Sequence, residues 1–374
     1  MIDGGKLIAR GSNSCVIKPS IPCDINKKPS NKRVSKIVYD EDSKKMLEDE
    51  KKQTDLIINI HDYQKWAIVF DTFCEAPEYS TLEKYDKKGI DECIQDNTRN
   101  KNFNHIGKIF NSFNSKMLTG ISGGKTLNEY FSIKMNTINT STAFETEFIE
   151  LMKMMEPLFL GLKEMYLHNI VHNDIKYNNI VLHNGKFKYI DFGLANHKDN
   201  KKAFRNRSSQ ESSTGRIYIF YPIEYIFFDS NIFKLRFILG NIKKRGNYNH
   251  YHDLMRFFNK VPILTVHKVM KALLRKGINE EEMIRKIDVY SLGSLIPLLL
   301  NRSSIDINII HKSKTATKFF NLFQEMCEPL CSDRINGQEA YDKYKLLINN
   351  LHSKKKTHSK KKTRSKKKTH SKKK

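Results

Sequence analysis

The sequence predicts an α+β fold with a β-rich first part and a helical second part. Short β-branched runs punctuated by Gly, Pro and Ser near the start indicate strands. Further on, apolar residues spaced three and four apart indicate buried helix faces. The chain has 374 residues, more than the ~100 to 200 of a typical domain, so two lobes or domains are expected.

The first part contains three predicted strands and one predicted helix. The strands cover residues 6–8, 15–18 and 33–39, and the helix, rich in Lys, Glu, Leu and Ile, covers 42–60. Residues 71–115 form a long polar stretch, which we expect to separate later strands of the same lobe.

The second part begins with a helical region near Ser141, and Pro157 is expected to kink it. Its apolar residues share the spacing of one buried helix face. They are Phe148, Leu151, Met152, Met155, Phe159, Leu162, Met165 and Tyr166.

A β-hairpin is predicted after this region. Asn184 and Gly185 separate two short runs, and an Asn-Gly pair tolerates the positive φ angles of a type I′ turn. The hairpin would bring two polar clusters, residues 171–179 and 191–193, together in space.

These two clusters contain the candidate chemistry. Asp174, Lys176 and Asn179 lie in the first cluster, and Asp191 lies in the second. Two carboxylates and a carboxamide suit a magnesium-bound polyphosphate, because Mg²⁺ prefers hard oxygen ligands and shares them with phosphate. Asp174 could accept the proton of an attacking hydroxyl, and Lys176 could neutralise the transferring phosphoryl group.

The composition excludes several classes of protein. A mean hydropathy of -0.58 and the lack of an apolar run near ~18 residues argue against a membrane-spanning chain. The start of the sequence has no secretion signature, so an intracellular location is expected. Six cysteines without a CxxC pair are expected to be reduced thiols, and no zinc site is predicted.

The positive charge is concentrated at the C-terminus. The chain carries a formal +25, but the 13 basic residues from Ser353 onward leave 53 basic against 41 acidic residues, or +12. The Lys-rich tail, residues 352–374, is expected to be disordered because it has no apolar side chain to bury. It could bind nucleic acid without sequence preference, bind acidic membrane lipid, direct nuclear import or have no dedicated partner.

The ordered motifs resemble those of a eukaryotic-type protein kinase. Residues 172–179, His-Asn-Asp-Ile-Lys-Tyr-Asn-Asn, resemble the HRDLKxxN catalytic loop, and residues 191–193 are the DFG triplet. The resemblance implies ATP and Mg²⁺ as cofactors and proteins as substrates. It also implies that Asp174 is the catalytic base, that Asn179 and Asp191 bind the metal, and that Lys176 indicates a serine/threonine enzyme.

Further motifs match the same family in chain order. Val34-Ser-Lys36-Ile resembles the VAIK strand, so Lys36 is expected to hold the α and β phosphates. Glu50 is the predicted ion-pair partner of Lys36, with Glu48 as a rival. Later in the chain, Pro222-Ile-Glu224 stands where APE is expected, residues 288–293 resemble DVWSLG, and Arg334 stands where the family's arginine pairs with the APE glutamate.

The resemblance implies a bilobal fold and a divided nucleotide site. The β-rich small lobe would cover residues 1–124 and the helical large lobe 125–351, with an insertion at about 226–287. The segment from Met117 to Gly124 resembles the adenine-binding hinge, with Leu118 as gatekeeper. The predicted nucleotide contacts besides Lys36 are Ala9, Arg10, Gly11, Ser12, Asn13, Ser14, Cys15, Val16, Thr119 and Ile121.

Some positions depart from the family pattern. The phosphate-covering loop keeps only the middle glycine of GxGxxG, which reduces its backbone freedom. Asn173 replaces the arginine of many kinases, so no partner for an activation-segment phosphate is expected. Activity is therefore predicted to be independent of phosphorylation there, and Thr214 is the substitute for the missing substrate-loop threonine. The candidate phosphorylation sites are Ser208, Ser209, Ser212, Ser213 and Thr214.

The sequence therefore predicts a protein serine/threonine kinase that uses Mg-ATP. Two alternatives stay open: a pseudokinase scaffold, suggested by the eroded glycine loop, and a small-molecule phosphotransferase, which shares an HxDxxxxN loop. The insertion before Asp288 is either a solvated helical insert or a docking surface for an acidic substrate. The composition and the insertions also look similar to kinases of large nucleocytoplasmic DNA viruses, which implies the host cytoplasm, nucleus or virion. The sequence does not indicate an oligomeric state.

Overall fold

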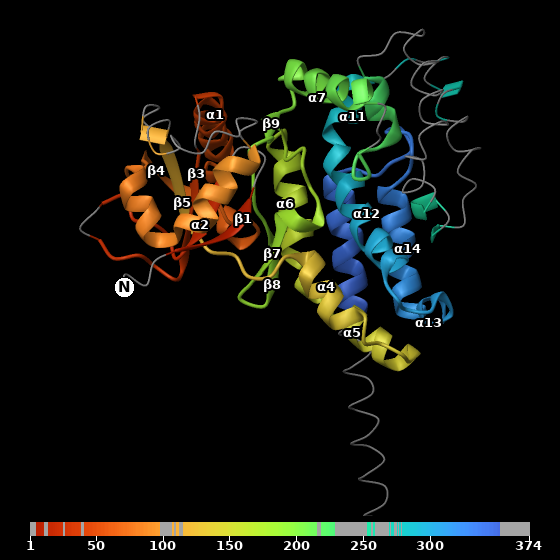
Figure 1. Cartoon of the computed structure of the whole chain (residues 1–374). Helices are drawn as coiled ribbons and strands as arrows, with labels where there is room; N and C mark the ends of the chain where they lie inside the picture. Colours follow the sequence, from red (N-terminus) through yellow and green to blue (C-terminus); the bar gives the residue numbers. More distant parts are fainter. Residues whose placement is uncertain are drawn as a thin grey trace, which may run out of the picture.

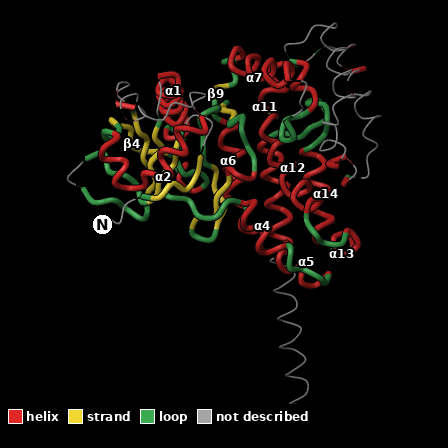
Figure 2. The backbone as a smooth tube through the Cα atoms, in the orientation of Figure 1, coloured by secondary structure: helices red, strands yellow, loops and turns green. Residues whose placement is uncertain are grey.

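The computed structural model consists of a β-rich lobe and a helical lobe (Figure 1). It describes residues 5–10, 14–24, 27–38, 41–97, 115–214, 218–228 and 279–351, and a few positions within 107–111 and 253–277. The predicted α+β class is confirmed, and the strands gather at one side of the molecule while helices dominate the other (Figure 2). The Lys-rich tail and most of the insertion before Asp288 lie outside the described residues.

The small lobe is built on a five-stranded antiparallel sheet in the order β1-β2-β3-β5-β4. Strands were predicted at the first three positions, and the structure places them there. The strands are β1 (Lys6–Arg10), β2 (Cys15–Lys18), β3 (Arg33–Ile37), β4 (Phe70–Glu75) and β5 (Lys116–Ile121).

Two helices belong to this lobe. Helix α1 (Glu41–Ile58) follows β3, as the charged stretch predicted. Helix α2 (Tyr79–Asn97) lies between β4 and β5 and contacts β1 and β2. The stretch 71–115 was expected to separate strands of this lobe, but it contains residues 71–75 of β4 itself and the kinked helix α2. The signal was weak because α2 buries only a few apolar residues, among them Leu82, Ile90 and Ile94.

The helical lobe surrounds a large apolar core. Its central helix α12 is buried from Ile287 to Leu300. Pro157 does not kink one long helix; the region splits at Met155 into two helices, and Pro157 lies at the start of the second. The helices are α4 (Leu127–Met135), α5 (Ser141–Met154), α6 (Glu156–Leu167), α7 (Lys201–Thr214), α11 (Glu280–Arg285), α12 (Ile287–Arg302), α13 (Ile307–His311) and α14 (Lys314–Met326).

The predicted hairpin connects the two lobes. Strand β7 (Ile180–His183) pairs with β8 (Lys186–Tyr189), and Asn184 and Gly185 both have positive φ, as an Asn-Gly turn requires. The backbone of Tyr189 bonds both Trp66 and Ile68, and the amide of Leu182 bonds the carbonyl of Lys125. The hairpin therefore bonds the segment before β4 and the segment after β5. The remaining short elements are β6 (Ile170–Val171), β9 (Asn196–His197), η1 (Tyr63–Lys65), η3 (Tyr177–Asn179) and η4 (Ile223–Phe227).

The cysteines differ from the prediction of reduced thiols. Cys15 is bonded to Cys93, and Cys23 is bonded to Cys74, both within the small lobe. The sequence could not show this, because each pair meets only after the sheet and α2 assemble. Cys327 and Cys331 are buried free thiols, and burial raises the pKa of Cys331 to about 12.

Within the described ranges, no helix is both long and apolar enough to cross a membrane.

Candidate active site

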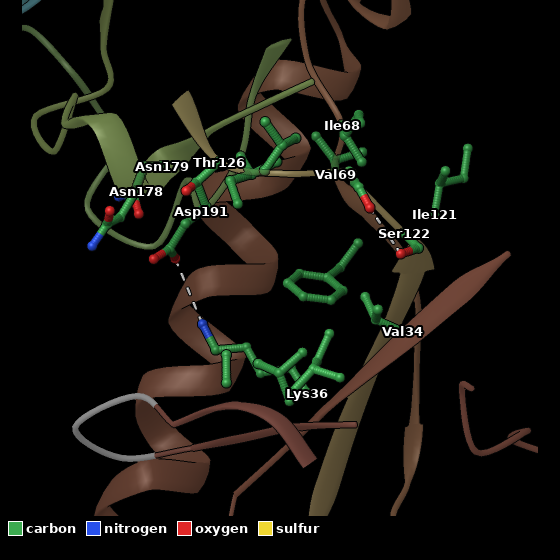
Figure 3. A pocket seen from close by; sticks show the side chains of 18 of the residues that line it. Val34, Lys36, Ile68, Val69, Ile121, Ser122, Thr126, Asn178, Asn179 and Asp191 are labelled. Atoms are coloured by element: carbon green, nitrogen blue, oxygen red, sulfur yellow. Dashed lines mark hydrogen bonds and ion pairs between the residues drawn. The ribbon is translucent and has the colours of Figure 1, made fainter. Parts of the chain in front are cut away.

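A cleft of about 740 Å³ lies between the sheet of the small lobe and the β7–β8 hairpin. Its apolar wall includes Val34 from β3 and Ile68 and Val69 from the segment before β4, and its polar end includes Lys36 and Asp191 (Figure 3). An apolar slot that ends in charged groups suits a ligand with a flat ring and an anionic chain.

Lys36 connects the sheet, helix α1 and the DFG segment. Its Nζ donates a hydrogen bond of 2.6 Å to Glu50 Oε2 and lies 3.6 Å from Asp191 Oδ1. The predicted pairing with Glu50 rather than Glu48 is thus confirmed. Burial alone would lower the pKa of Lys36, but the charges of Asp191 and Glu50 outweigh it and raise that pKa. Lys36 therefore stays cationic, as a phosphate ligand must.

Asp191 is the second charged group at this end of the cleft. Its backbone has a φ of 61°, a left-handed conformation that costs free energy in a residue other than glycine. Burial would raise the pKa of this carboxyl, but the charges of Lys36, Lys176 and His172 hold it below its ordinary value. Asp191 is therefore an ionised oxygen donor near neutral pH.

The catalytic-loop residues form a hydrogen-bonded group around Asp174. Lys176 Nζ and Asn179 Nδ2 each donate a bond of 2.8 Å to Asp174 Oδ2. Asn179 Nδ2 also bonds the Asp174 carbonyl at 3.0 Å, so the Oδ1 atom of Asn179 is its remaining oxygen donor. The amide of Ile190 donates to the Asn179 carbonyl at 3.0 Å. This last bond brings Asp191, the next residue, to the catalytic loop, as the hairpin predicted.

Asp288 holds the backbone of the catalytic loop in place through two hydrogen bonds. Its carboxylate accepts bonds from the amides of His172, at 2.6 Å, and Asn173, at 3.0 Å. Asn173 has a φ of 59°, and its carbonyl accepts a bond of 2.5 Å from the hydroxyl of Tyr221. The loop thus takes its strained shape because groups distant in sequence satisfy its backbone.

The segment after α7 is attached to the helical lobe by a buried ion pair. Arg334 Nη2 lies 2.8 Å from Glu224 Oε1, and both side chains are almost wholly excluded from solvent. Glu224 also accepts a bond of 2.8 Å from the amide of Cys331. This is the pairing that the APE-like motif and Arg334 predicted.

The structure places only some of the predicted nucleotide contacts at the cleft. Among the described residues, Ala9, Arg10, Ser14, Val16 and Ile121 line it together with Lys36. Gly11, Ser12 and Asn13 lie outside the described residues.

The side chains of Cys15 and Thr119 do not line the cleft, contrary to the prediction. Successive side chains of a strand point to opposite faces, so Cys15 faces α2 when Val16 faces the cleft. The Thr119 hydroxyl accepts a bond of 3.2 Å from Arg33.

Leu118, the predicted gatekeeper, does not line the cleft either. It packs in a separate apolar cluster with Val38 and Leu47. Phe70 of β4, rather than Leu118, lines the cleft. A Cβ atom on Gly120 would lie 2.7 Å from the Val69 carbonyl oxygen and 3.0 Å from the Phe70 Cα. The backbone of β4 can therefore approach β5 closely here because Gly120 has no side chain, a pairing that sequence reasoning missed.

Tyr218 is a second residue that the motifs did not indicate. Its hydroxyl lies 3.5 Å from Asp174 Oδ1, near the position where a threonine was expected. The side chain of Thr214, the predicted substitute, lies outside the described residues. The segment around Tyr218 is rich in Tyr and Phe, so the sequence alone does not distinguish Tyr218 as a candidate site residue.

The polar end of the cleft fits a magnesium ion held with phosphate. Asn179 and Asp191 offer two oxygen donors of the kind Mg²⁺ prefers, and Mg²⁺ commonly takes its other ligands from phosphate and water. In the described part of the chain, no group of three or more His, Cys, Asp or Glu gathers as a metal cluster. Asn179 and Asp191 thus form an open donor set, which leaves coordination positions of the ion for phosphate or water.

Comparison with known families gives one match. Residues 78–215 match the family model of the protein kinase domain. The matched segment contains Asp174, Asn179 and Asp191, whereas Lys36 and Glu50 lie before it. No curated protein matches the chain.

The fold and this match indicate the same architecture. A five-stranded antiparallel sheet, a helical lobe and a catalytic loop beside a DFG segment form a protein kinase fold of the α+β class. The match supports a phosphotransferase of the protein kinase type.

Proposed function

We propose that the protein transfers the γ-phosphoryl group of Mg-ATP to serine and threonine hydroxyls of proteins. One observation carries this proposal. Lys36, Lys176, Asn179 and Asp191 line one cleft. Glu50 bonds Lys36, and Asp174 bonds Lys176 and Asn179, so both carboxylates are held directly behind residues of that lining.

Each group has a separate task in this reaction. Lys36, held by Glu50, binds the α and β phosphates as a cation. Asn179 and Asp191 hold Mg²⁺, which when bound neutralises charge on the phosphates. Asp174 Oδ2 accepts bonds of 2.8 Å from Lys176 and Asn179, whereas Oδ1 has only the longer 3.5 Å contact with the Tyr218 hydroxyl. We therefore assign Oδ1 to orient the substrate hydroxyl and accept its proton.

In the transfer step, every bond formed or broken and the proton of the hydroxyl are accounted for by ATP, the substrate hydroxyl and these residues. The hydroxyl oxygen forms a bond to the γ-phosphorus, the bond from that phosphorus to the β-phosphate oxygen breaks, and ADP leaves. The proton of the hydroxyl passes to Asp174. Lys176 lies 2.8 Å from Asp174, where its charge stabilises the phosphoryl group as it transfers. A lysine at this position supports the serine/threonine preference through the family resemblance.

Radiolabelled ATP and a generic basic protein test the proposal. Label should reach the protein with Mg²⁺ and not in the presence of a chelator, and acid hydrolysis should release phosphoserine and phosphothreonine. Asp174→Asn should lower kcat by ~10² to 10⁴. Asp199→Asn is the matched control. The Asp199 carboxylate is exposed and pairs with Lys198, so this variant should leave kcat unchanged.

The outcome also separates the alternatives. Nucleotide binding without transfer would indicate a pseudokinase scaffold, and transfer to a small molecule but not to protein would indicate a small-molecule phosphotransferase. Label on tyrosine alone would contradict the hydroxyl preference. The likeness to kinases of large nucleocytoplasmic DNA viruses stays a prediction from the sequence.

A further inference from the structure

Helix α7 lies beside α11 at one end of the helical lobe (Figure 1). It contacts η4 of the segment that follows it. The two join in a buried apolar cluster, which contains Phe204 of α7, Tyr221, Tyr225 and Phe228 of the following segment, and Val171 of β6. Val171 directly precedes the catalytic loop, so the cluster joins α7 to the start of that loop.

Two hydroxyl bonds fasten α7 to this segment. The Ser208 hydroxyl donates a bond of 2.6 Å to the carbonyl of Tyr225. The Tyr225 hydroxyl donates a bond of 3.0 Å to the carbonyl of Phe204. All three residues are buried. Because one bond runs from α7 to η4 and the other from η4 to α7, the helix is held in one place relative to the segment.

Tyr221 continues this connection to the catalytic loop. Its hydroxyl donates a bond of 2.5 Å to the carbonyl of Asn173 and accepts a bond of 3.2 Å from Nε of Arg207, on α7. The guanidinium of Arg207 also lies over the Tyr221 ring, 5.8 Å from its centroid. Hydrogen bonds in a chain polarise one another, so a hydroxyl that accepts from a cation is a stronger donor. Arg207 thus reinforces the bond from Tyr221 to the loop.

The carbonyl of Asn173 belongs to the peptide group that directly precedes Asp174. The φ of Asn173, 59°, is a left-handed conformation that needs support from its surroundings. Asp288 bonds the amide of Asn173 at 3.0 Å and so holds the peptide group before this residue. Tyr221 holds the peptide group after it, which fixes the plane of the backbone from which the Asp174 side chain extends.

The Asn173 carbonyl depends on this bond because its surroundings are dry. Asn173 and Tyr221 are both buried. A buried carbonyl without a partner costs free energy, so the loop would have to shift if the Tyr221 hydroxyl were removed.

We propose that Tyr221 is a positioning residue for Asp174, and that Arg207 acts on Asp174 through Tyr221. This inference rests on the proposed function, because it assumes that Asp174 accepts the substrate proton. Asn173 offers no cation to a phosphate on the activation segment. The activation segment brings a cation to Asn173 instead, and the link is a neutral hydroxyl. The shape of the catalytic loop is thus built into the unmodified chain.

Two matched tyrosine variants test the role of the hydroxyl. Tyr221→Phe and Tyr225→Phe each keep the ring and remove one buried hydroxyl with its bond to a backbone carbonyl, but only the Tyr221 bond reaches the catalytic loop. We expect kcat to fall ~10-fold in Tyr221→Phe, as for loss of a hydrogen bond reinforced by a charged group. Tyr225→Phe should keep the wild-type kcat.

The two substrates of the reaction should respond differently in this experiment. In Tyr221→Phe, KM for ATP should stay within about twofold of the wild type, because Lys36 and Asp191 are unchanged. A general loss of folded protein would lower the activity of both tyrosine variants, whereas a displaced Asp174 lowers kcat in one of them.

Arg207 is tested by variants that separate its charge from its length. Arg207→Gln should lower kcat ~3-fold, since the hydroxyl loses a charged donor, and Arg207→Lys should recover part of this loss. Tyr221→Phe/Arg207→Gln should be no slower than Tyr221→Phe, because phenylalanine has no hydroxyl for residue 207 to bind. Arg205→Gln is the matched control on α7. Arg205 pairs with Glu280 of α11, so this variant should leave kcat unchanged.

Hydrogen exchange examines the loop without any dependence on catalysis. Deuterium uptake by the peptide that contains Asp174, measured by mass spectrometry, should be faster in Tyr221→Phe than in the wild type and unchanged in Tyr225→Phe. Wild-type kcat and uptake in Tyr221→Phe would overturn the positioning role, as would an equal loss of kcat in both tyrosine variants. A wild-type chain that transfers no phosphate would instead overturn the proposed function, and the exchange rates would still decide whether Tyr221 holds the loop.

Discussion

The carboxylate of Asp288 accepts a hydrogen bond of 2.6 Å from the backbone amide of His172, 116 positions earlier in the chain. The other Asp288 oxygen bonds the amide of Asn173, whose φ is positive. Asp288 belongs to α12, the central helix of the large lobe. The position of Asp174, two residues after His172, therefore depends on a helix that is buried from Ile287 to Leu300.

Asp288→Asn should lower kcat without changing ATP affinity. An amide side chain offers one acceptor oxygen instead of two, so one buried N–H of the loop loses its partner and the loop shifts. A displacement of ~1 Å at a reacting group can cost ~10²-fold in rate. Steady-state kinetics with both substrates measure the effect. Asp306→Asn is the control because Asp306 caps the distant helix α13; an equal loss in that variant would contradict the prediction.

The sequence predicted the parts of the site that depend on local spacing. Asp174, Lys176 and Asn179 lie within one short loop, and the Asn-Gly turn returns the chain to Asp191. A hairpin of this kind fixes its own geometry, so sequence alone places these side chains together. Glu50 could be preferred over Glu48 only through the family resemblance, and the ion pair to Lys36 required the sheet and α1 to be in place.

The sequence could not predict the contacts that form between elements far apart in the chain. Phe70, which lines the cleft, pairs with Gly120 on the adjacent strand, where a Cβ atom would come within 2.7 Å of the Val69 carbonyl oxygen. Cys15 faces away from the cleft because α2, which gave only a weak helical signal, packs on that face of β2. Both depend on strand register and helix packing, which a pattern along the chain does not contain.

Glu50→Gln should reduce activity more than Glu48→Gln. The neutral amide cannot hold the Lys36 ammonium as a carboxylate does, so Lys36 would lose a charge-assisted bond and its orientation toward the phosphates. We expect kcat/KM for ATP to fall ~10- to 100-fold, since hydrogen bonds of charged groups contribute ~1.5 to 3 kcal/mol. Glu48 is the matched control on the same helix. Equal kinetics in both variants would show that the Lys36–Glu50 pair has no role in the reaction.

Arg334→Ala should destabilise the helical lobe. Its guanidinium is buried against Glu224 at 2.8 Å, and removing one partner of a buried pair leaves an uncompensated charge, at a cost of ~3 to 5 kcal/mol. Urea unfolding followed by circular dichroism measures the change. Arg205→Ala removes a partly exposed ion pair with Glu280 and should cost less than ~1 kcal/mol. A loss for Arg334→Ala as small as that would contradict the buried pairing.

Phosphatase treatment should leave the activity unchanged. Asn173 offers no cation to an activation-segment phosphate. The hydroxyl of Ser208 is buried and donates a bond of 2.6 Å to the carbonyl of Tyr225, so it already has a structural partner. Activity is compared before and after treatment, with mass spectrometry to confirm that phosphate is removed. A phosphate-dependent loss of activity, restored by rephosphorylation, would contradict the prediction.

Tyr218→Phe should lower kcat while the KM for ATP stays constant. The Tyr218 hydroxyl lies 3.5 Å from Asp174 Oδ1, the atom that we assign to the substrate hydroxyl, and at this range it helps to orient that carboxylate. We expect kcat to fall ~5- to 10-fold, as for loss of a net hydrogen bond of about 1 kcal/mol.

The control is Tyr177→Phe, whose hydroxyl bonds Arg302 rather than Asp174. If Tyr218 only packed against Phe220 and Tyr221, phenylalanine would preserve that contact and kcat would match the wild type. A selective fall in kcat for Tyr218→Phe alone therefore assigns the hydroxyl, rather than the ring, to the phosphoryl-transfer step.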